Sequence, residues 1–370
     1  MSSGYATAFL LPNISIPSAV LEIFGTLGLI MIVLEGSLDL TLSKKNLPLI
    51  KSAAIVSTFI TLISVTGLSA MFHFIFHAPW LSAVLYAIPF SIVSSAIAIP
   101  SVAKLHPEKR EFIIYESTIS DIIGILLFNY ALVLGKNSGS ALIYPISFVL
   151  MLVISLVVSL GMIFILGKMK KGSRNLLTLG VLIILYESGK LLHLSSLVLI
   201  LLFGLLFNNL RPLLEKQKLR RFFHPRNHAV ALSEFKSITS EAAFFIRTLF
   251  FFSFGISIKL LDLANPATII SGLITVLFLY LARWIQLKAV TKKSIMPEIL
   301  IAPRGLITIL LFATIPAEYA VVKGLNNGLL LFVILSTNIV MALALIFHRI
   351  APEDCDTDTV SCVEEVQTID

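Results

Sequence analysis

The sequence predicts an all-α polytopic membrane protein with about eleven transmembrane helices, and three observations lead to this class. Charged residues make up only 13% of the 370 residues and hydrophobic residues make up 57%, whereas soluble domains contain about 25% charged residues. The mean hydropathy is +0.96. Apolar runs of about 20 residues, the length that crosses a bilayer core as a helix, recur along the chain.

Each predicted span is one of these apolar runs, bounded by polar or basic residues. The seventh run is short and the eighth is long, so we expect tilt or an interfacial section there. In chain order the predicted spans are 18–40, 49–76, 80–103, 111–135, 141–167, 175–192, 194–209, 230–258, 266–288, 296–316 and 325–348.

The third and the tenth spans contain Pro100 and Pro303, which predict interrupted helices. Proline lacks an N–H and leaves the carbonyl four residues earlier without its helical partner. In lipid such a carbonyl must face protein or a water-filled cavity. One kinked helix is common in membrane proteins, but two of them beside polar residues indicate crossed broken helices around a site at the middle of the membrane.

The interrupted spans also predict how the chain is organised. Spans one to four and eight to eleven correspond in order and enter the bilayer from opposite sides, which is the pattern of an inverted repeat. The predicted organisation is a single transmembrane domain at 1–348, with repeat halves at 18–135 and 230–348, intervening helices at 141–209, a basic cytoplasmic loop at 210–229 and a disordered cytoplasmic tail at 349–370.

The net charge of +7 is explained by membrane topology. Lys and Arg concentrate in every second gap between spans, while the alternate gaps hold at most one basic residue each. Because cytoplasmic loops are enriched in these residues, the pattern places the N-terminus outside and the C-terminus in the cytoplasm of a cell or inner membrane. The basic residues then face anionic lipid, and no nucleic-acid partner is expected.

The fourth span carries two carboxylates, in Glu116-Ser117-Thr118-Ile119-Ser120-Asp121. A charge at the centre of a membrane helix costs about 2.5–3.5 kcal/mol, so such residues usually mark an ion or proton pathway. Ser117 and Asp121 are four residues apart and share a helix face. A hydroxyl beside a carboxylate suits a small hard cation such as Na+. We therefore predict a cation site formed by Asp121, Ser117, Ser120 and the backbone carbonyl of Ala98 at the first helix break.

Glu116 lies on the neighbouring face, and Arg304 beside the second break is its predicted partner, since arginine stays charged and forks onto a carboxylate. This ion pair would leave Asp121 as the acid that exchanges a proton for a cation. The alternatives are a purely structural ion pair for Glu116 and a structural hydrogen bond between helices for Asp121.

Three more charged residues are candidates for a gate or a funnel. Glu35 and Asp39 lie near the cytoplasmic end of the first span, where a solvated helix end explains them as well as an ion funnel does. Arg247 lies in mid-span and could pair with Glu241 or another acid, in a structural or a gating role.

Motifs of several enzyme classes are absent from the sequence. It contains no His-Glu-x-x-His, no Walker-type phosphate loop and no Gly-x-Ser-x-Gly. We expect neither an enzyme nor a nucleotide-driven pump, and no cofactor. An ion gradient would then supply the energy for transport.

Four segments resemble the cation:proton antiporter superfamily, on the side of the NhaP-like Na+/H+ exchangers. Leu34-Glu35-Gly36-Ser37-Leu38-Asp39-Leu40 is similar to the Glu-Gly-Gly-Leu-Glu-Leu end of the family's third helix. Glu116 to Asp121 is similar to its Glu-Ser-x-x-Asn-Asp core. Phe250-Phe251-Phe252-Ser253-Phe254-Gly255 is similar to its Phe-Phe-x-x-x-Gly helix, and Pro303-Arg304-Gly305-Leu306 to its Pro-Arg-Gly-Leu signature.

The resemblance implies the NhaA-like antiporter fold, a dimer, and a moving core that carries the ion across a fixed scaffold. It implies Asp121 as carrier of proton and cation, Ser117 as ligand, and Glu116 with Arg304 as the stabilising pair. Ile99 stands where the family has an acid, in Ala98-Ile99-Pro100 against Thr-Asp-Pro. Two of the family's thirteen helices have no counterpart here, so we expect an N-terminally shortened chain without its first two helices.

The predicted function is electroneutral antiport of a monovalent cation, Na+ or K+, for one proton, because Ser120 stands where the family usually has Asn and supplies no second carboxylate next to the carrier. Its predicted partners are these ions, the lipid bilayer and a second copy in a homodimer. The alternative is a non-transporting or ion-sensing membrane homologue, which the loss of the acid at Ile99 favours. Symport of an organic anion on the same architecture is a third interpretation.

Overall fold

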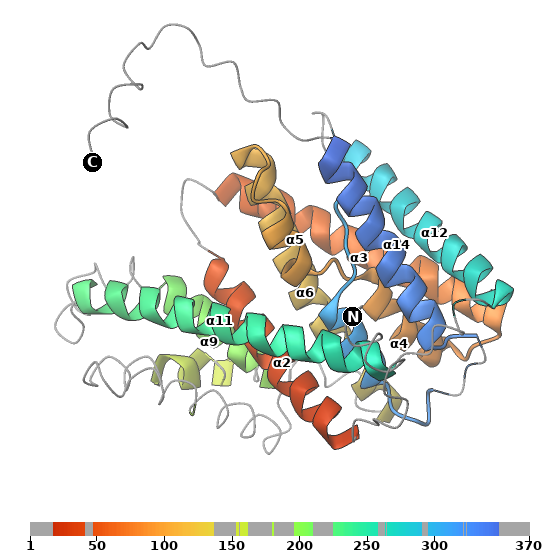
Figure 1. Ribbon diagram of the computed structural model, residues 1–370, viewed down its shortest axis with the longest axis horizontal. Helices are drawn as coiled ribbons and strands as arrows, with labels where there is room; N and C mark the ends of the chain where they lie inside the picture. Colours follow the sequence, from red (N-terminus) through yellow and green to blue (C-terminus); the bar gives the residue numbers. More distant parts are fainter. Residues whose placement is uncertain are drawn as a thin grey trace, which may run out of the picture.

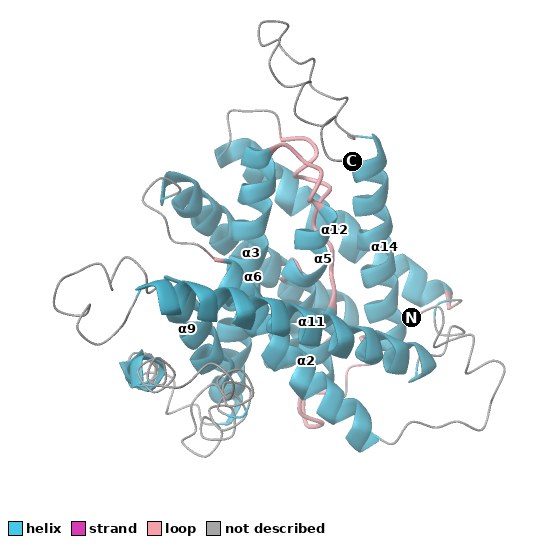
Figure 2. Ribbon diagram, turned by 60° about the vertical axis from the view of Figure 1, so that its left-hand side comes forward, coloured by secondary structure: helices cyan, strands magenta, loops and turns pink. Residues whose placement is uncertain are grey.

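The computed structural model describes residues 18–40, 47–136, 196–209, 225–257, 265–290 and 295–347 apart from 321 and 323, together with 153–161 apart from 155 and the single residues 180 and 263. Throughout this part of the chain the regular structure is helical, without a strand (Figure 2). The helices are α2 (Ser18–Asp39), α3 (Leu47–Phe76), α4 (Trp80–Ser91), α5 (Ser95–Ser101), α6 (Pro107–Lys136), α9 (Ser196–Asn209), α11 (Pro225–Ser257), α12 (Pro266–Val290), α13 (Leu306–Ala313) and α14 (Asn327–Phe347).

The predicted all-α class is confirmed, and apart from the interrupted third and tenth spans the described helices begin and end within about five residues of the predicted spans. α11 begins at Pro225, inside the segment predicted as the basic loop; the remainder of that loop lies outside the described residues, as do almost all of the spans 141–167 and 175–192 and the tail 349–370. Among the described residues, four helical stretches are long and apolar enough to cross a membrane: Leu47–Phe76, Trp80–Ser101, Pro266–Ala289 and Asn327–Phe347.

Both predicted interruptions are present, and they meet in space. The first separates α4 from α5 at residues 92–94, and the second is the extended segment 301–305 before α13. The N–H of Ser94 in the first donates to the carbonyl of Pro303 in the second at 2.9 Å. The unpaired backbone of each interruption is therefore partly satisfied by the other, as the crossed broken helices of the predicted fold require.

The first interruption does not lie at the proline that predicted it. Pro100 is inside α5, and the break follows Pro89, which is inside α4. In the tenth span residues 296–300 form turns, so that only the second half of the span is an α-helix. Proline predicts that backbone groups are freed nearby, but the tertiary partners of those groups decide where the helix stops.

The described helices pack as two groups with α5, α6 and α13 between them. α3, α12 and α14 run side by side on one side of the molecule, whereas α2, α9 and α11 lie together on the other (Figure 1). One hydrophobic cluster joins α3, α4, α13 and α14, and another joins α2, α9 and α11 through Leu34, Phe203 and Phe235. The two interruptions thus lie deep in the molecule, next to α6.

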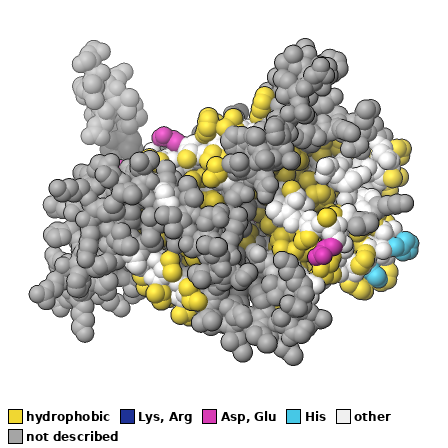
Figure 3. Space-filling view, turned by 90° about the horizontal axis from the view of Figure 1, so that it is seen from below, with side chains coloured by type: hydrophobic (Ala, Val, Ile, Leu, Met, Phe, Trp, Pro, Cys, Tyr) yellow, Lys and Arg dark blue, Asp and Glu magenta, His cyan; other side chains and the backbone are white. Residues whose placement is uncertain are grey.

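Large apolar side chains cover the outer faces of several helices. On α12, Leu273, Leu277 and Leu281 recur at helical spacing and are 60%, 67% and 50% exposed. Figure 3, a view from below, shows hydrophobic atoms over much of the described surface on that face of the molecule, with few charged groups among them. A soluble protein rarely exposes such extended apolar faces, and they are suited to contact with lipid.

Candidate functional site

The helix that carries the predicted carrier lies at the centre of the protein. α6 begins at Pro107, whose fixed φ suits the first helical position, and Glu108 in its first turn complements the helix dipole. One face of α6 packs against α3, α4 and α5. As a result Glu116 and Asp121 are only 1% and 6% exposed, among apolar residues.

Asp121 is bound by the residue that begins α5. Its Oδ2 atom accepts a hydrogen bond from the Ser95 hydroxyl at 2.5 Å and another from the Ser95 N–H at 3.2 Å. Its Oδ1 atom is buried and has no hydrogen-bond partner. Buried carboxylate oxygens are nearly always paired, so the free Oδ1 atom is the strongest indication of a ligand site in the described part of the chain.

Ser95 also lines a cavity of about 290 Å³. This cavity adjoins a second cleft of about 270 Å³, and the two share Glu35 and Ser240. Ser95 therefore touches the cavity and Asp121 at once, so a single residue separates the carboxylate from this space. The cavity is lined by Ile32, Glu35, Gly36, Ser95, Ala96, Ile99, Pro100, Ser240, Phe244 and Arg247.

Arg247 of α11 connects two other helices across this cavity. It donates to Glu35 Oε2 on α2 at 2.5 Å and to the Ala96 carbonyl on α5 at 3.0 Å. In an uninterrupted helix the Ala96 carbonyl would bond the N–H of residue 100, which Pro100 lacks. The arginine thus binds the carbonyl that the proline frees.

The acid that forms an ion pair with Arg247 is Glu35. Glu241, the partner considered from the sequence, instead accepts a hydrogen bond from Ser237 on its own helix at 3.2 Å. Glu35 also accepts one from Ser240 at 2.9 Å. The structure therefore brings the predicted funnel residue Glu35 and the predicted gate residue Arg247 together, while the side chain of Asp39 lies outside the description.

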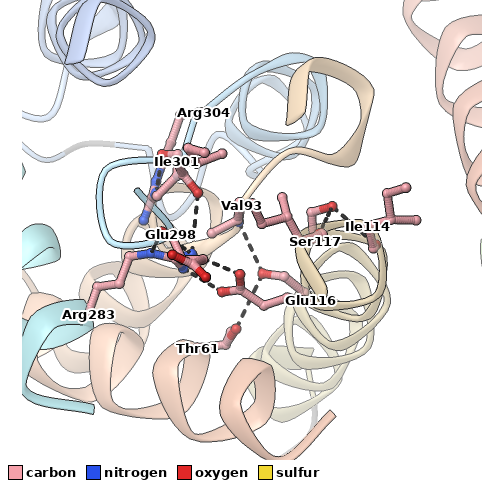
Figure 4. A network of polar contacts seen from close by, with 12 residues as sticks. Thr61, Val93, Ile114, Glu116, Ser117, Arg283, Glu298, Ile301 and Arg304 are labelled. Carbon is pink, nitrogen blue, oxygen red and sulfur yellow. Dashed lines mark hydrogen bonds and ion pairs between the residues drawn. The ribbon is translucent and has the colours of Figure 1, made fainter. Parts of the chain in front are cut away.

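The predicted ion pair between Glu116 and Arg304 is wrong, because Glu116 pairs with Arg283 of α12. Figure 4 shows the two side chains pointing toward each other. Arg283 Nη1 and Nη2 each bind one carboxylate oxygen, the second at 2.8 Å, and Arg283 is itself 2% exposed. Arg283 also donates to the carbonyls of Glu298 and Ile301 in the segment before α13.

Arg304 binds backbone carbonyls in the same region instead of a carboxylate. Its Nε donates to the carbonyl of Phe90 at 2.8 Å and its Nη1 to the carbonyl of Ala302 at 2.6 Å. Both carbonyls lie beside the interruptions, where no helical N–H can reach them. Backbone oxygens freed by the breaks therefore bind Arg304, and this leaves Glu116 to the arginine on α12.

The other predicted cation ligands have partners of their own. The Ser117 hydroxyl donates to the carbonyl of Ile113 at 2.7 Å, within α6. The Ser120 hydroxyl accepts the N–H of Val93 at 3.0 Å and lies 3.4 Å from the Thr61 hydroxyl. The Ala98 carbonyl accepts the N–H of Val102 at 3.1 Å. None of these contacts is to Asp121.

Sequence reasoning missed Ser95 and Arg283, although both carried a signal. Ser95 stands in the polar stretch that predicted the first break, and Arg283 is a basic residue inside an apolar span. Within the described residues no three His, Cys, Asp or Glu side chains gather closely enough to hold a metal ion. The site at Asp121 therefore consists of one carboxylate bound by the hydroxyl and the N–H of Ser95.

Comparisons with known proteins agree with this architecture. Residues 1–348 match the family described as sodium/hydrogen exchanger, transmembrane. The structure of the sodium proton antiporter MjNhaP1 from Methanocaldococcus jannaschii at pH 8 is similar with a TM-score of 0.72 and 22% identity, over 93% of this chain and 90% of that one. The structure of the same antiporter from an electron microscopy map gives 0.66 and 20%, over 93% and 86%. No curated protein sequence matches.

Proposed function

The chain belongs to the sodium/hydrogen exchanger family of integral membrane proteins, and we propose that it exchanges Na+ or K+ for one proton with Asp121 as the shared carrier. The observation that carries the proposal is the Oδ1 atom of Asp121, which is buried, without a partner and one residue away from a cavity. A carboxylate in that setting has to hold either a proton or a cation, since a bare charge away from water is costly.

The charges around Asp121 support electroneutral exchange. Glu116 is the other buried acid of α6, and its charge is neutralised by Arg283. Ile99 lines the cavity at the place where the family carries an acid, and it offers no charge. Asp121 is then the acid at the crossing that can change its protonation state, so one proton leaves for each cation that binds.

The position of the cavity supports alternating access. On the topology that the basic residues predict, Glu35 lies near the cytoplasmic end of α2, and the adjoining cleft extends to Lys236 and Ser237 in the first half of α11. The structure would then represent a state open to the cytoplasm. Movement of α3–α6 and α12–α14 against α2, α9 and α11, held in a homodimer, would present Asp121 to the other side.

The test is transport by the purified protein in liposomes. A pH-sensitive dye reports the proton flux that follows addition of Na+, Li+ or K+, with and without valinomycin to reveal net charge movement. We expect saturable flux that is independent of valinomycin, and we expect Asp121→Asn to abolish it. Full activity of Asp121→Asn at unchanged protein content would exclude Asp121 as carrier.

A second candidate function is a membrane homologue that senses ions or binds a partner without transport. Ile99 favours it, because the acid that relatives carry near the cation is missing and the residue is part of the cavity wall. This candidate predicts Na+ binding without proton flux. Radioactive sodium that binds to the detergent-solubilised protein but never enters the liposomes would support it over antiport.

A further inference from the structure

We propose that Ser95 is a cation ligand as well as the residue that orients Asp121, and that it sets the affinity for the transported ion. The inference deepens the proposed exchange and rests on it. Ser95 is 2% exposed, it lines the cavity and its hydroxyl makes the shortest contact of Asp121. It is not among the site residues that the sequence predicts.

The two carboxylate oxygens of Asp121 differ in their hydrogen bonding. Ser95 donates to Oδ2 with both its hydroxyl and its N–H, and thereby fixes the plane of the carboxylate. Oδ1 remains without a partner. The proton or the cation can therefore exchange at Oδ1 while Oδ2 stays bound to Ser95. The carboxylate then keeps its orientation throughout the transport cycle.

The hydroxyl oxygen of Ser95 can itself act as a ligand. A hydroxyl has one hydrogen to donate and two lone pairs to offer. The hydrogen is engaged with Asp121, so the lone pairs can still bind a cation that comes from the cavity. A cation could then bridge the Ser95 hydroxyl oxygen and Asp121 Oδ1 without breaking the bond that orients the carboxylate.

The site needs such a neutral ligand. Ile99 supplies no carboxylate, and neither the Ser117 hydroxyl, which donates to Ile113, nor the Ser120 hydroxyl, which accepts the N–H of Val93, is bonded to Asp121 as the Ser95 hydroxyl is. The neighbouring Ser94 hydroxyl is also buried without a partner, at the point where the two interruptions cross. Two buried oxygens without a partner are thus adjacent to Ser95: the hydroxyl of Ser94, which precedes it in the chain, and Oδ1 of the carboxylate that it binds, as expected of a site that receives an ion.

The experiment compares three serine variants with the unaltered protein, all as full-length chains, in liposomes and in detergent. Ser95→Ala removes the hydroxyl, and Ser95→Thr keeps it, with the adjoining cavity beside it for the added methyl group. Ser91→Ala is the matched control, because Ser91 is also fully buried but its hydroxyl only donates to the carbonyl of Ala87 on its own helix. The readouts are the Na+ KM, the maximal rate and the binding of radioactive sodium to the solubilised protein.

We expect Ser95→Ala to raise the Na+ KM and the Na+ dissociation constant by about tenfold or more, the effect of losing one interaction with a charged group. Ser95→Thr should restore both values to within about threefold, and Ser91→Ala should resemble the unaltered protein. Equal sodium affinity in Ser95→Ala and Ser91→Ala overturns the proposal, as does an equal loss in Ser95→Ala and Ser95→Thr.

Asp121→Asn in the same assays separates this proposal from the proposed function. If Asp121→Asn abolishes exchange while Ser95→Ala leaves sodium affinity unchanged, only the role of Ser95 is refuted. If Asp121→Asn exchanges ions normally, the carrier assignment and the role of Ser95 are both refuted.

Discussion

Arg283 on α12 binds both carboxylate oxygens of Glu116 on α6, inside the protein. The same guanidinium reaches the carbonyls of Glu298 and Ile301, so it joins α6 to the extended segment before α13. Two helices and one interruption are therefore held by one side chain. The site at Asp121 lies a little more than one turn further along α6, and its geometry depends on this attachment.

Removing Arg283 should be among the most destabilising single changes in this region. Arg283→Ala leaves the charge of Glu116 buried and unpaired, which typically costs about 3–5 kcal/mol. Glu116→Gln should cost less, because the arginine keeps its backbone partners. Thermal unfolding in detergent and the yield of folded protein measure both effects. Arg283→Lys retains the charge but not the fork, so a stability equal to that of the unaltered protein would contradict the importance of the bidentate contact.

Arg247 and Pro100 should be coupled through the Ala96 carbonyl. Arg247→Gln should lower stability by about 1–2 kcal/mol, since Glu35 loses its ion pair with the arginine and the freed carbonyl loses the hydrogen bond that the arginine donates. Pro100→Ala restores an N–H four residues after Ala96, so it should cost less in the Arg247→Gln background than alone. A double-mutant cycle on thermal unfolding gives the coupling free energy. Strict additivity would show that the arginine does not substitute for the missing N–H.

The class, the spans and the two interruptions could be predicted from sequence because they depend on local properties. Twenty apolar residues must cross the bilayer as a helix whatever their neighbours are, and a proline frees a carbonyl wherever it stands. The resemblance to the family likewise points to Asp121 as the proposed carrier by its position in a motif. These predictions need no knowledge of which helices touch.

Partners could not be predicted in the same way, because helical spacing tells which residues share a face but not which helix that face meets. The sequence predicted Arg304 as the partner of Glu116, whereas the structure pairs Glu116 with Arg283, and both arginines are buried. The choice between them depends on the carbonyls of Phe90 and Ala302, which bind Arg304 only after both helices are interrupted. The contact between Ser95 and Asp121 could not be predicted either, because it depends on where the break at 92–94 places the start of α5.

The crossing of the two interruptions should be intolerant of added volume at Gly305. A Cβ atom there would lie 2.6 Å from the Ser94 hydroxyl and 2.7 Å from Ile97. Gly305→Ala is therefore expected to cost about 1–3 kcal/mol and to slow exchange. Gly28→Ala is the control, because its Cβ would meet Ile246 at an ordinary 3.5 Å. If both variants unfold at the same temperature, the crossing is less tightly packed than the structure indicates.

Restoring an acid at position 99 should raise the affinity for sodium. Ile99 lines the cavity that reaches Ser95, so the carboxylate of Ile99→Asp would face a cation on its way to Asp121. A second negative charge within several ångströms attracts a cation by roughly a few kcal/mol at an intermediate effective dielectric constant, part of which is lost to desolvation and to repulsion from Asp121. We expect the Na+ KM to fall by about tenfold as a net result.

The control is Ile99→Asn, which has nearly the same shape as the aspartate variant and no charge. Its Na+ KM should stay close to that of the unaltered protein, because only the charge adds attraction. The comparison also decides between the two candidate functions. If Ile99→Asp alone gives proton flux on addition of Na+, the natural isoleucine has disabled a transporter, whereas flux in all three proteins means that Asp121 and its serines are sufficient for exchange.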